Sequence, residues 1–167
     1  MILFISKQKD FSTLIDAFSI VQKSINNTKL LILGEGDEHA SLQLQINELQ
    51  LEDDVQLCDF VENPLSYMAK SDLFVLSSLI EGTPNVLLEA MACGCKIIST
   101  DSLGGSSELL HHGIYAGLVP MKDHQTLVAT IMAVYSEKIT NGQDFALQQS
   151  QKKSLNNYIS SCFPNYQ

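Results

Sequence analysis

The chain has 167 residues, a formal net charge of −9 and ten basic residues, all of them lysine. With 45% hydrophobic residues, it is long enough for one compact domain with a buried core. The acidic balance argues against nucleic acid as a partner, because a phosphate backbone is normally met by a basic patch. A small anionic ligand stays open, since a helix N-terminus and one or two lysines can hold a diphosphate locally.

Cysteine usage and apolar runs indicate the compartment. The four cysteines form neither a CxxC pair nor a regular framework, and no signal-peptide pattern precedes them, so we expect reduced thiols in the cytoplasm. The pair Cys93 and Cys95 lacks further ligands at workable spacing, so we expect no metal. Apolar runs such as 73–78 are too short to span a bilayer. Any membrane contact is expected to be peripheral, at the inner face.

In chain order, short β-prone runs alternate with helical patterns. Apolar residues between 11 and 25 recur at helical spacing, a less regular helix follows at 42–51, and another is predicted at 126–138. This alternation favours right-handed βαβ units and an α/β, Rossmann-like parallel sheet with helices on both faces. We expect one domain at 1–138, then a C-terminal helix and tail at 139–167. The predicted strands are 2–5, 29–34, 55–58, 73–77, 96–99 and 116–120.

Ligands of such sheets bind where strands lead into helices, which directs attention to the loops 34–38, 58–64, 78–84 and 100–106. The third loop opens the stretch EGTPNVLLEAMACG, residues 81–94. Thr83 is predicted to cap a helix whose first residue is Pro84 and whose end is marked by Gly94. The first N–H groups of this helix lack intrahelical acceptors, and its dipole favours an anion there. A diphosphate could sit at this end.

Two acids flank that position. Glu89 lies about 7.5 Å beyond Pro84 along the axis, where a carboxylate could accept hydrogen bonds from ribose hydroxyls. Glu81 precedes the cap and could accept hydrogen bonds from a sugar on the far side of the phosphates. The spacing alone is equally compatible with two solvated carboxylates that flank a core helix.

The motifs together resemble a known family. EGTPNVLLEAMACG, with KQKDFSTLIDAF, LLILGEG, LCDFVENP, KIISTD, GG, SELL and GLVP, closely resembles the nucleotide-sugar-binding C-terminal half of the family 4 retaining glycosyltransferases of the GT-B fold. The resemblance runs from residue 1 to about 135. It implies a transferase that takes a sugar from a nucleoside diphosphate sugar, with UDP favoured, and passes it to a glycan or lipid-linked acceptor with retention of configuration. It implies no cofactor and no metal, and the chain has no D-x-D sequence.

The resemblance assigns roles to particular residues. Glu89 would bind the ribose hydroxyls, and Glu81 would bind the donor sugar as a catalytic residue. Asn85 and Val86 would offer backbone N–H groups to the diphosphate.

Two further residues take roles from the resemblance. Lys9, the second catalytic residue, would neutralise the leaving diphosphate, and the backbone of Val61 would lie against the nucleobase. The alternative for Lys9 is an ordinary exposed lysine before a helix capped by Asp10, and the alternative for Val61 is plain packing.

Two departures from the family pattern bear on activity. The Gly-Arg dipeptide expected before Lys9 is missing, and Lys7 could replace the arginine only as a point charge, without its planar fork. The N-terminal acceptor-binding domain of the family is not in this sequence, so the acceptor site is expected on a separate domain or subunit. Three interpretations stay open: a fragment or shortened gene product, one subunit of a split enzyme, and a non-catalytic nucleotide-binding or interaction module.

Overall fold

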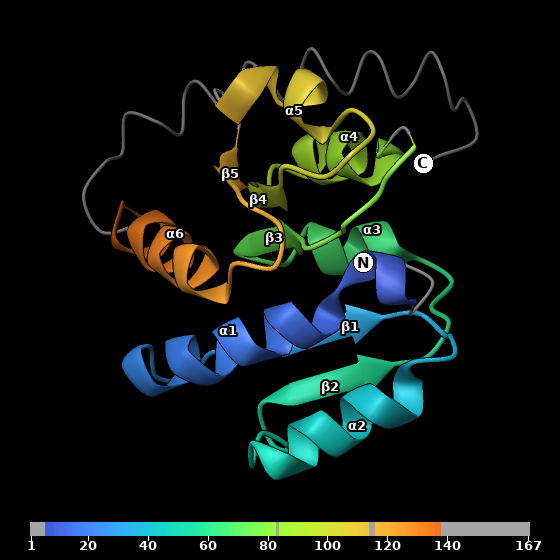
Figure 1. Ribbon diagram of the computed structural model, residues 1–167, viewed down its shortest axis with the longest axis vertical. Helices are drawn as coiled ribbons and strands as arrows, with labels where there is room; N and C mark the ends of the chain where they lie inside the picture. The colour runs from blue at the N-terminus through green and yellow to red at the C-terminus, as the bar shows by residue number, and fades with distance from the viewer. Residues whose placement is uncertain (1–5, 83, 114–115, 138–167) are drawn as a thin grey trace.

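The computed structural model describes residues 6–82, 84–113 and 116–137 (Figure 1). The strand predicted at 2–5 and the C-terminal helix and tail predicted at 139–167 lie outside the described residues. Thr83, the predicted helix cap, lies outside them as well.

The other five predicted strands are confirmed to within two residues at each end. Every strand pair is parallel, as the alternating pattern predicts. Within the described residues the strands form two sheets, β1-β2 and β3-β4-β5. The strands are β1 (Leu30–Leu33), β2 (Val55–Cys58), β3 (Leu73–Leu76), β4 (Lys96–Thr100) and β5 (Gly117–Val119).

Helices connect the strands, and the three predicted from periodicity are confirmed. Pro64–Met68 was missed, because five residues carry no periodic pattern; Asn63 caps this helix by accepting a hydrogen bond from the Ser66 N–H at 3.2 Å. The helices are η1 (Lys7–Lys9), α1 (Phe11–Ser24), α2 (His39–Glu48), α3 (Pro64–Met68), α4 (Asn85–Ala92), α5 (Ser106–Leu109), η2 (His111–Gly113) and α6 (His124–Glu137).

The core gathers around α1, which contacts both α2 and α6. Its apolar residues recur every three or four positions and are buried, Ile15 completely. Burial of a side chain of this size contributes about 1.5–3 kcal/mol. α4 packs on β4 while α6 contacts β4 and β5, and Figure 1 shows these two helices on opposite faces of the sheet. The expected parallel α/β architecture, with helices on both faces, is therefore present.

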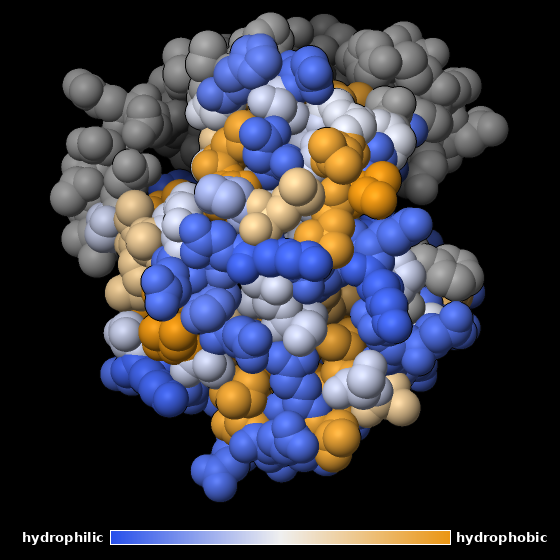
Figure 2. Space-filling view, in the orientation of Figure 1, coloured by the Kyte–Doolittle hydropathy of each residue, from blue (hydrophilic) through white to orange (hydrophobic). Residues whose placement is uncertain are grey.

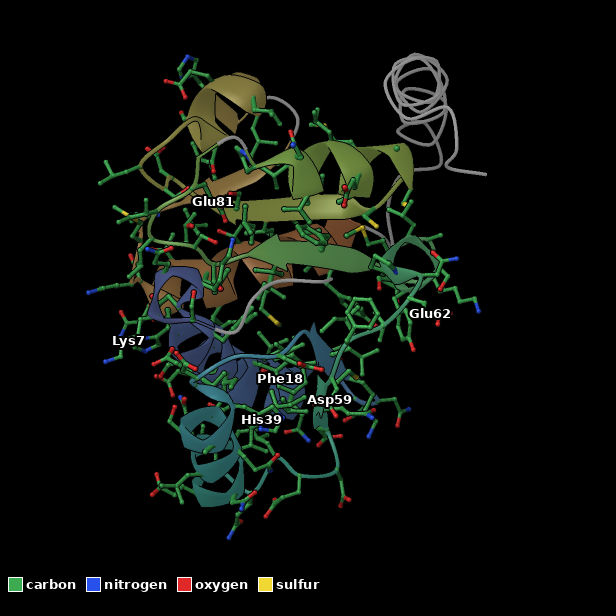
Figure 3. All side chains as sticks on the ribbon, turned by 90° about the vertical axis from the view of Figure 1, so that its right-hand side faces the viewer. Lys7, Phe18, His39, Asp59, Glu62 and Glu81 are labelled. Atoms are coloured by element: carbon green, nitrogen blue, oxygen red, sulfur yellow. The ribbon has the colours of Figure 1, made fainter. Side chains whose placement is uncertain are left out.

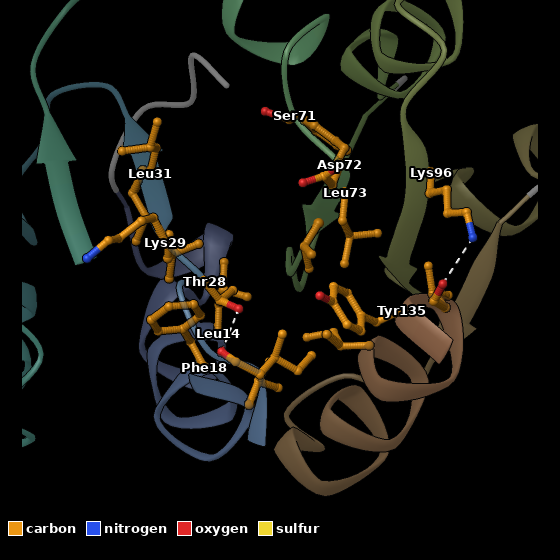
Figure 4. A pocket seen from close by; sticks show the side chains of 18 of the residues that line it. Leu14, Phe18, Thr28, Lys29, Leu31, Ser71, Asp72, Leu73, Lys96 and Tyr135 are labelled. Atoms are coloured by element: carbon orange, nitrogen blue, oxygen red, sulfur yellow. Dashed lines mark hydrogen bonds between the residues drawn. The ribbon is translucent and has the colours of Figure 1, made fainter. Parts of the chain in front are cut away.

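A cavity of about 450 Å³, lined by both apolar and polar side chains, lies between the two sheets (Figure 4). Its walls come from β1, β3, α1 and α6, with Leu14 and Phe18 on one side and Leu73 and Tyr135 on the other. Within the described residues, β1 and β3 each pair along one edge and turn the other toward this space. Among the described residues, the packing of α1 on α6 joins the part of the fold that holds β1-β2 to the part that holds β3-β4-β5.

The surface carries its apolar residues in separate places. Figure 2 shows small apolar patches among hydrophilic residues on the face that it draws. Among the described residues, the large apolar side chains that are exposed come from several different elements, including Leu44 of α2, Phe60 after β2 and Ile80 after β3. The stripe predicted at 42–51 is divided accordingly, because Leu42 and Ile46 are buried while Leu44 points outward.

Candidate functional site

The 3₁₀ turn η1 is joined to the loop that follows β3. The Ser77 hydroxyl donates a hydrogen bond to the Lys9 carbonyl at 2.6 Å, and the Leu79 N–H donates to the Gln8 carbonyl at 2.7 Å. Ser77 is buried, so this contact is shielded from water. These bonds bring together two segments about 70 positions apart in the sequence and hold Lys9 beside the loop that carries Glu81.

Lys9 and Glu81 form an ion pair in this joint. The Lys9 Nζ lies 2.7 Å from the Glu81 Oε1, and the side chains are only 15% and 11% exposed. The buried Ser78 hydroxyl donates to the same oxygen at 2.6 Å. Charge-assisted hydrogen bonds of this length are about twice as strong as neutral ones. The structure thus brings together the two residues predicted to be catalytic, and the alternative of an ordinary exposed lysine does not hold.

The loop after β4 supports the backbone of Glu81. The Glu81 N–H donates to the Leu103 carbonyl at 2.8 Å, and the Leu103 N–H donates to the Leu79 carbonyl at 3.3 Å. Gly104 follows with φ of 111°, and a Cβ at this position would lie 1.5 Å from the Glu81 carbonyl oxygen. Only glycine permits this approach and this backbone conformation. Gly104 therefore helps to place Glu81, a role that the glycine pair in the sequence did not specify.

Helix α4 starts one residue later than predicted. Pro84 is the capping residue with ψ of 70°, so the first helical residue is Asn85, and the Leu87 N–H donates to the Pro84 carbonyl at 2.9 Å. Proline fixes φ but leaves ψ free, so it can precede a helix as well as begin one. Asn85 is exposed at this end, Val86 is half-buried, and Gly94 has the predicted left-handed conformation. The N–H groups of the first turn remain suited to an anion.

Glu89 lies on the same helix, four residues after Asn85 and thus on the same face. That spacing corresponds to about 6 Å along the axis. The side chain is half-buried, and burial raises the pKa of its carboxyl group above the ordinary value of 4.5. Hydrogen bonds from a ligand's hydroxyl groups would favour the charged form of this carboxyl.

Val61 and Lys7 lie on other elements. Val61 is half-buried in the connection between β2 and α3, and β2 belongs to the two-stranded sheet, not to the sheet of β3 and β4. Lys7 is exposed on η1. In Figure 3, Lys7 and Glu81 lie on one side of the view, and Asp59 and Glu62 of the β2-α3 connection lie on the other. The structure thus assembles Lys9 and Glu81 directly, and places Asn85, Val86 and Glu89 on the next helix.

The cavity between the sheets is separate from this site. None of the predicted site residues lines it. The Cys93 and Cys95 thiols do not suggest a metal centre, because each donates to a carbonyl oxygen of α3, from Leu65 at 3.7 Å and Met68 at 2.9 Å. Among the residues that the structure describes, no group of three or more histidine, cysteine or acidic side chains could hold a metal ion.

A family comparison decides the classification. The model of the glycosyl transferases group 1 family matches residues 2–155, most of the chain. The chain belongs to this family.

Curated relatives agree with that membership. The N-acetylgalactosamine-N,N'-diacetylbacillosaminyl-diphospho-undecaprenol 4-alpha-N-acetylgalactosaminyltransferase of Campylobacter jejuni is 37% identical over 74% of this chain and 33% of its own length. The amylovoran biosynthesis glycosyltransferase AmsK of Erwinia amylovora is 32% identical over 77% of this chain and 33% of its own length. The chain thus spans about a third of these relatives.

Solved structures show the same fold. Anabaena HepE in complex with UDP-glucose has a TM-score of 0.74 and 25% identity, over 95% of this chain and 47% of HepE. TarM has a TM-score of 0.80 and 19% identity, over 100% of this chain and 32% of TarM. The chain therefore has the Rossmann-like fold found within GT-B glycosyltransferases. No helix among the described residues is long and apolar enough to cross a membrane.

Proposed function

We propose that this chain is the donor-binding part of a retaining glycosyltransferase. It binds a nucleoside diphosphate sugar, with UDP as the favoured nucleotide, and serves transfer of the sugar to a glycan or lipid-linked acceptor. The observation that carries this proposal is the shielded Lys9–Glu81 pair, which stands just before the N-terminus of α4. A cation, a carboxylate and a helix N-terminus together match the parts of a sugar diphosphate.

The site orders the parts of the donor along α4. The diphosphate lies at the N–H groups of Asn85 and Val86, and the ribose reaches Glu89 about one turn further along the helix. Glu81 accepts hydrogen bonds from the donor sugar on the other side of the diphosphate. The backbone of Val61 lies against the nucleobase from the connection that follows β2.

The chemistry concerns the charge that develops on the leaving group. The bond between the anomeric carbon and the β-phosphate oxygen breaks, and its electron pair stays on that oxygen. The acceptor hydroxyl forms the new bond to the anomeric carbon and passes its proton to the leaving β-phosphate oxygen. The Lys9 ammonium and the first turn of α4 stabilise the growing negative charge, and such fixed donors commonly supply the largest part of catalysis.

The relatives support the donor and acceptor classes. HepE was solved with UDP-glucose, and the name of the Campylobacter relative includes a diphospho-undecaprenol acceptor. Because the chain spans about a third of its curated relatives, we assign the acceptor site to a further domain or a separate subunit. The peripheral contact of such an enzyme with the inner face of the membrane belongs to the same proposal.

A second candidate is a nucleotide-binding module without catalysis. One observation favours it: the chain contains no arginine, and the Lys9 ammonium is already paired with Glu81. A lysine also lacks the planar fork with which arginine holds a phosphate. Glycosyl transfer by the chain together with an acceptor domain would reject this candidate, whereas UDP binding alone would not.

Calorimetric titration with UDP, GDP and UDP-glucose tests the donor site. Lys9→Ala and Glu89→Ala are each expected to weaken UDP binding about tenfold or more, since a hydrogen bond to a charged group contributes about 1.5–3 kcal/mol. Lys23→Ala and Glu48→Ala change the same residue types at exposed helix positions and serve as controls. If neither UDP nor GDP binds, the donor-site proposal fails. If UDP binds and both site variants match the wild type, the residue assignments fail instead.

A further inference from the structure

A buried serine shares the carboxylate oxygen that Lys9 binds. The Ser78 hydroxyl donates to the Glu81 Oε1 at 2.6 Å, and the Lys9 Nζ lies 2.7 Å from the same atom. Ser78 is 0% exposed and Glu81 is three residues further along the same loop. Both donors bind Oε1 and so fix the orientation of the carboxylate. The other oxygen, Oε2, can then accept a hydrogen bond from a sugar hydroxyl.

The two donors are held by different parts of the fold. Ser78 is the second residue after β3, and its carbonyl accepts a hydrogen bond from the hydroxyl of Thr100 at the end of β4. Thr100 is itself buried, and its single hydroxyl proton is shared with the Leu76 carbonyl at 3.3 Å, so Ser78 is anchored to the β3-β4 sheet. Lys9 reaches Glu81 from η1 through a long side chain with several rotatable bonds. The serine is therefore the rigid donor and the lysine is the movable one.

The proposed function makes competing demands on Lys9. Its ammonium is paired with Glu81 in the free protein, yet it is also the cation assigned to the diphosphate. When the ammonium turns toward phosphate oxygens, the Glu81 carboxylate loses a charged donor. A nearly buried carboxylate without fixed donors would reorient or recruit water, and would no longer present a defined oxygen to the sugar.

We infer that Ser78 is a positioning residue, which keeps the Glu81 carboxylate oriented toward the donor sugar while Lys9 leaves it for the diphosphate. This inference rests on the proposed function and deepens it. Ser78 acts through Glu81 and touches no part of the nucleotide. Its effect therefore appears in the recognition of the sugar and not in the recognition of UDP.

The test compares UDP with UDP-glucose, and with UDP-N-acetylglucosamine as a second sugar probe, by calorimetry on the full chain. Ser78→Ala is expected to keep the affinity for UDP within about twofold, and to lower the ratio of UDP-sugar to UDP affinity about five- to tenfold. Ser78→Thr retains the hydroxyl and is expected to keep the wild-type ratio within about twofold. Thermal unfolding of each variant verifies that it is folded.

Ser99→Ala is the matched control, because Ser99 is also 0% exposed and its hydroxyl donates to the neighbouring Thr100 carbonyl, at 2.9 Å. Equal ratios in Ser78→Ala and Ser99→Ala, with UDP binding retained, would overturn the inference alone. An equal decrease in the ratio of UDP-sugar to UDP affinity in Ser78→Thr and Ser78→Ala would also overturn it. That result would mean that the packing of the serine side chain matters and its hydroxyl does not. If the wild type binds neither UDP nor either sugar probe, the proposed function fails and the inference fails with it.

Discussion

Alanine at position 104 probes how the loop after β4 places Glu81. The new Cβ would lie 1.5 Å from the Glu81 carbonyl oxygen and 2.7 Å from its carbonyl carbon. Carbon and oxygen atoms that are not bonded approach to about 3.3 Å, so the two loops must separate by about 2 Å. That movement breaks the hydrogen bond from the Glu81 N–H to the Leu103 carbonyl.

The loss of unfolding free energy in Gly104→Ala has two parts, which a matched variant separates. A side chain at φ of 111° strains the backbone by about 1–3 kcal/mol, and the lost hydrogen bond adds about 1 kcal/mol. Gly105 has nearly the same φ, 106°, but a Cβ there meets its nearest neighbours at 3.7 and 3.9 Å. Gly105→Ala therefore carries the strain without the overlap. Gly104→Ala is expected to be less stable than Gly105→Ala by at least about 1 kcal/mol.

Urea unfolding measures the difference in stability, and calorimetry measures its effect on the site. Because the overlap displaces the Glu81 backbone, Gly104→Ala is also expected to weaken UDP-glucose relative to UDP about tenfold, while Gly105→Ala changes this ratio less. Equal unfolding free energies of the two variants, within about 0.5 kcal/mol, together with an unchanged ratio would refute the reasoning.

Two further predictions concern pH. Burial raises the folded-state pKa of Glu89, so the stability linked to this group is fully present below its ordinary value of 4.5 and is lost as pH rises through the folded-state pKa. Glu89→Gln is therefore expected to melt at a higher temperature than the ligand-free wild type at pH 7, with a gain that disappears near pH 4; a gain independent of pH would contradict this cause. The side-chain and backbone hydrogen bonds from Thr126, at 2.6 and 2.9 Å, lower the pKa of Asp123, so its contribution is present above its ordinary value of 3.8 and is lost as pH falls through the folded-state pKa. Asp123 precedes α6 and accepts the Thr126 N–H of its first turn, so Asp123→Ala is expected to lower the melting temperature at pH 6 but not in strong acid. Equal losses at both pH values would count against a contribution from the ionised carboxylate.

Local patterns in the sequence predicted most of the fold. The apolar runs that became β1 to β5 are short and bounded by turn residues, and the repeat of apolar positions in α1 is regular, so their type could be predicted without tertiary information. The five-residue helix α3 carries no such repeat. The predicted start of α4 was one residue too early, because proline fits both the capping position and the first helical position.

The candidate site was predicted as a set of residues but not as an arrangement. The order of Glu81, Asn85 and Glu89 along one loop and one helix follows from spacing, and their roles in binding remain predictions. The pairing of Lys9 with Glu81 joins residues 72 positions apart, a separation at which sequence periodicity carries no information. A serine pair directly after a buried strand and a glycine pair after the next one were the only signals for Ser78 and Gly104.

The sequence alone therefore determined the fold class, the family resemblance and the residue types available for a sugar diphosphate, because these depend on local composition and spacing. Only the tertiary structure decided which donors hold the Glu81 carboxylate, since η1, the end of β3 and the loop after β4 meet there from distant parts of the chain. It also decided why position 104 must be glycine, because that requirement comes from the carbonyl of another loop and not from the neighbours of Gly104 in the sequence.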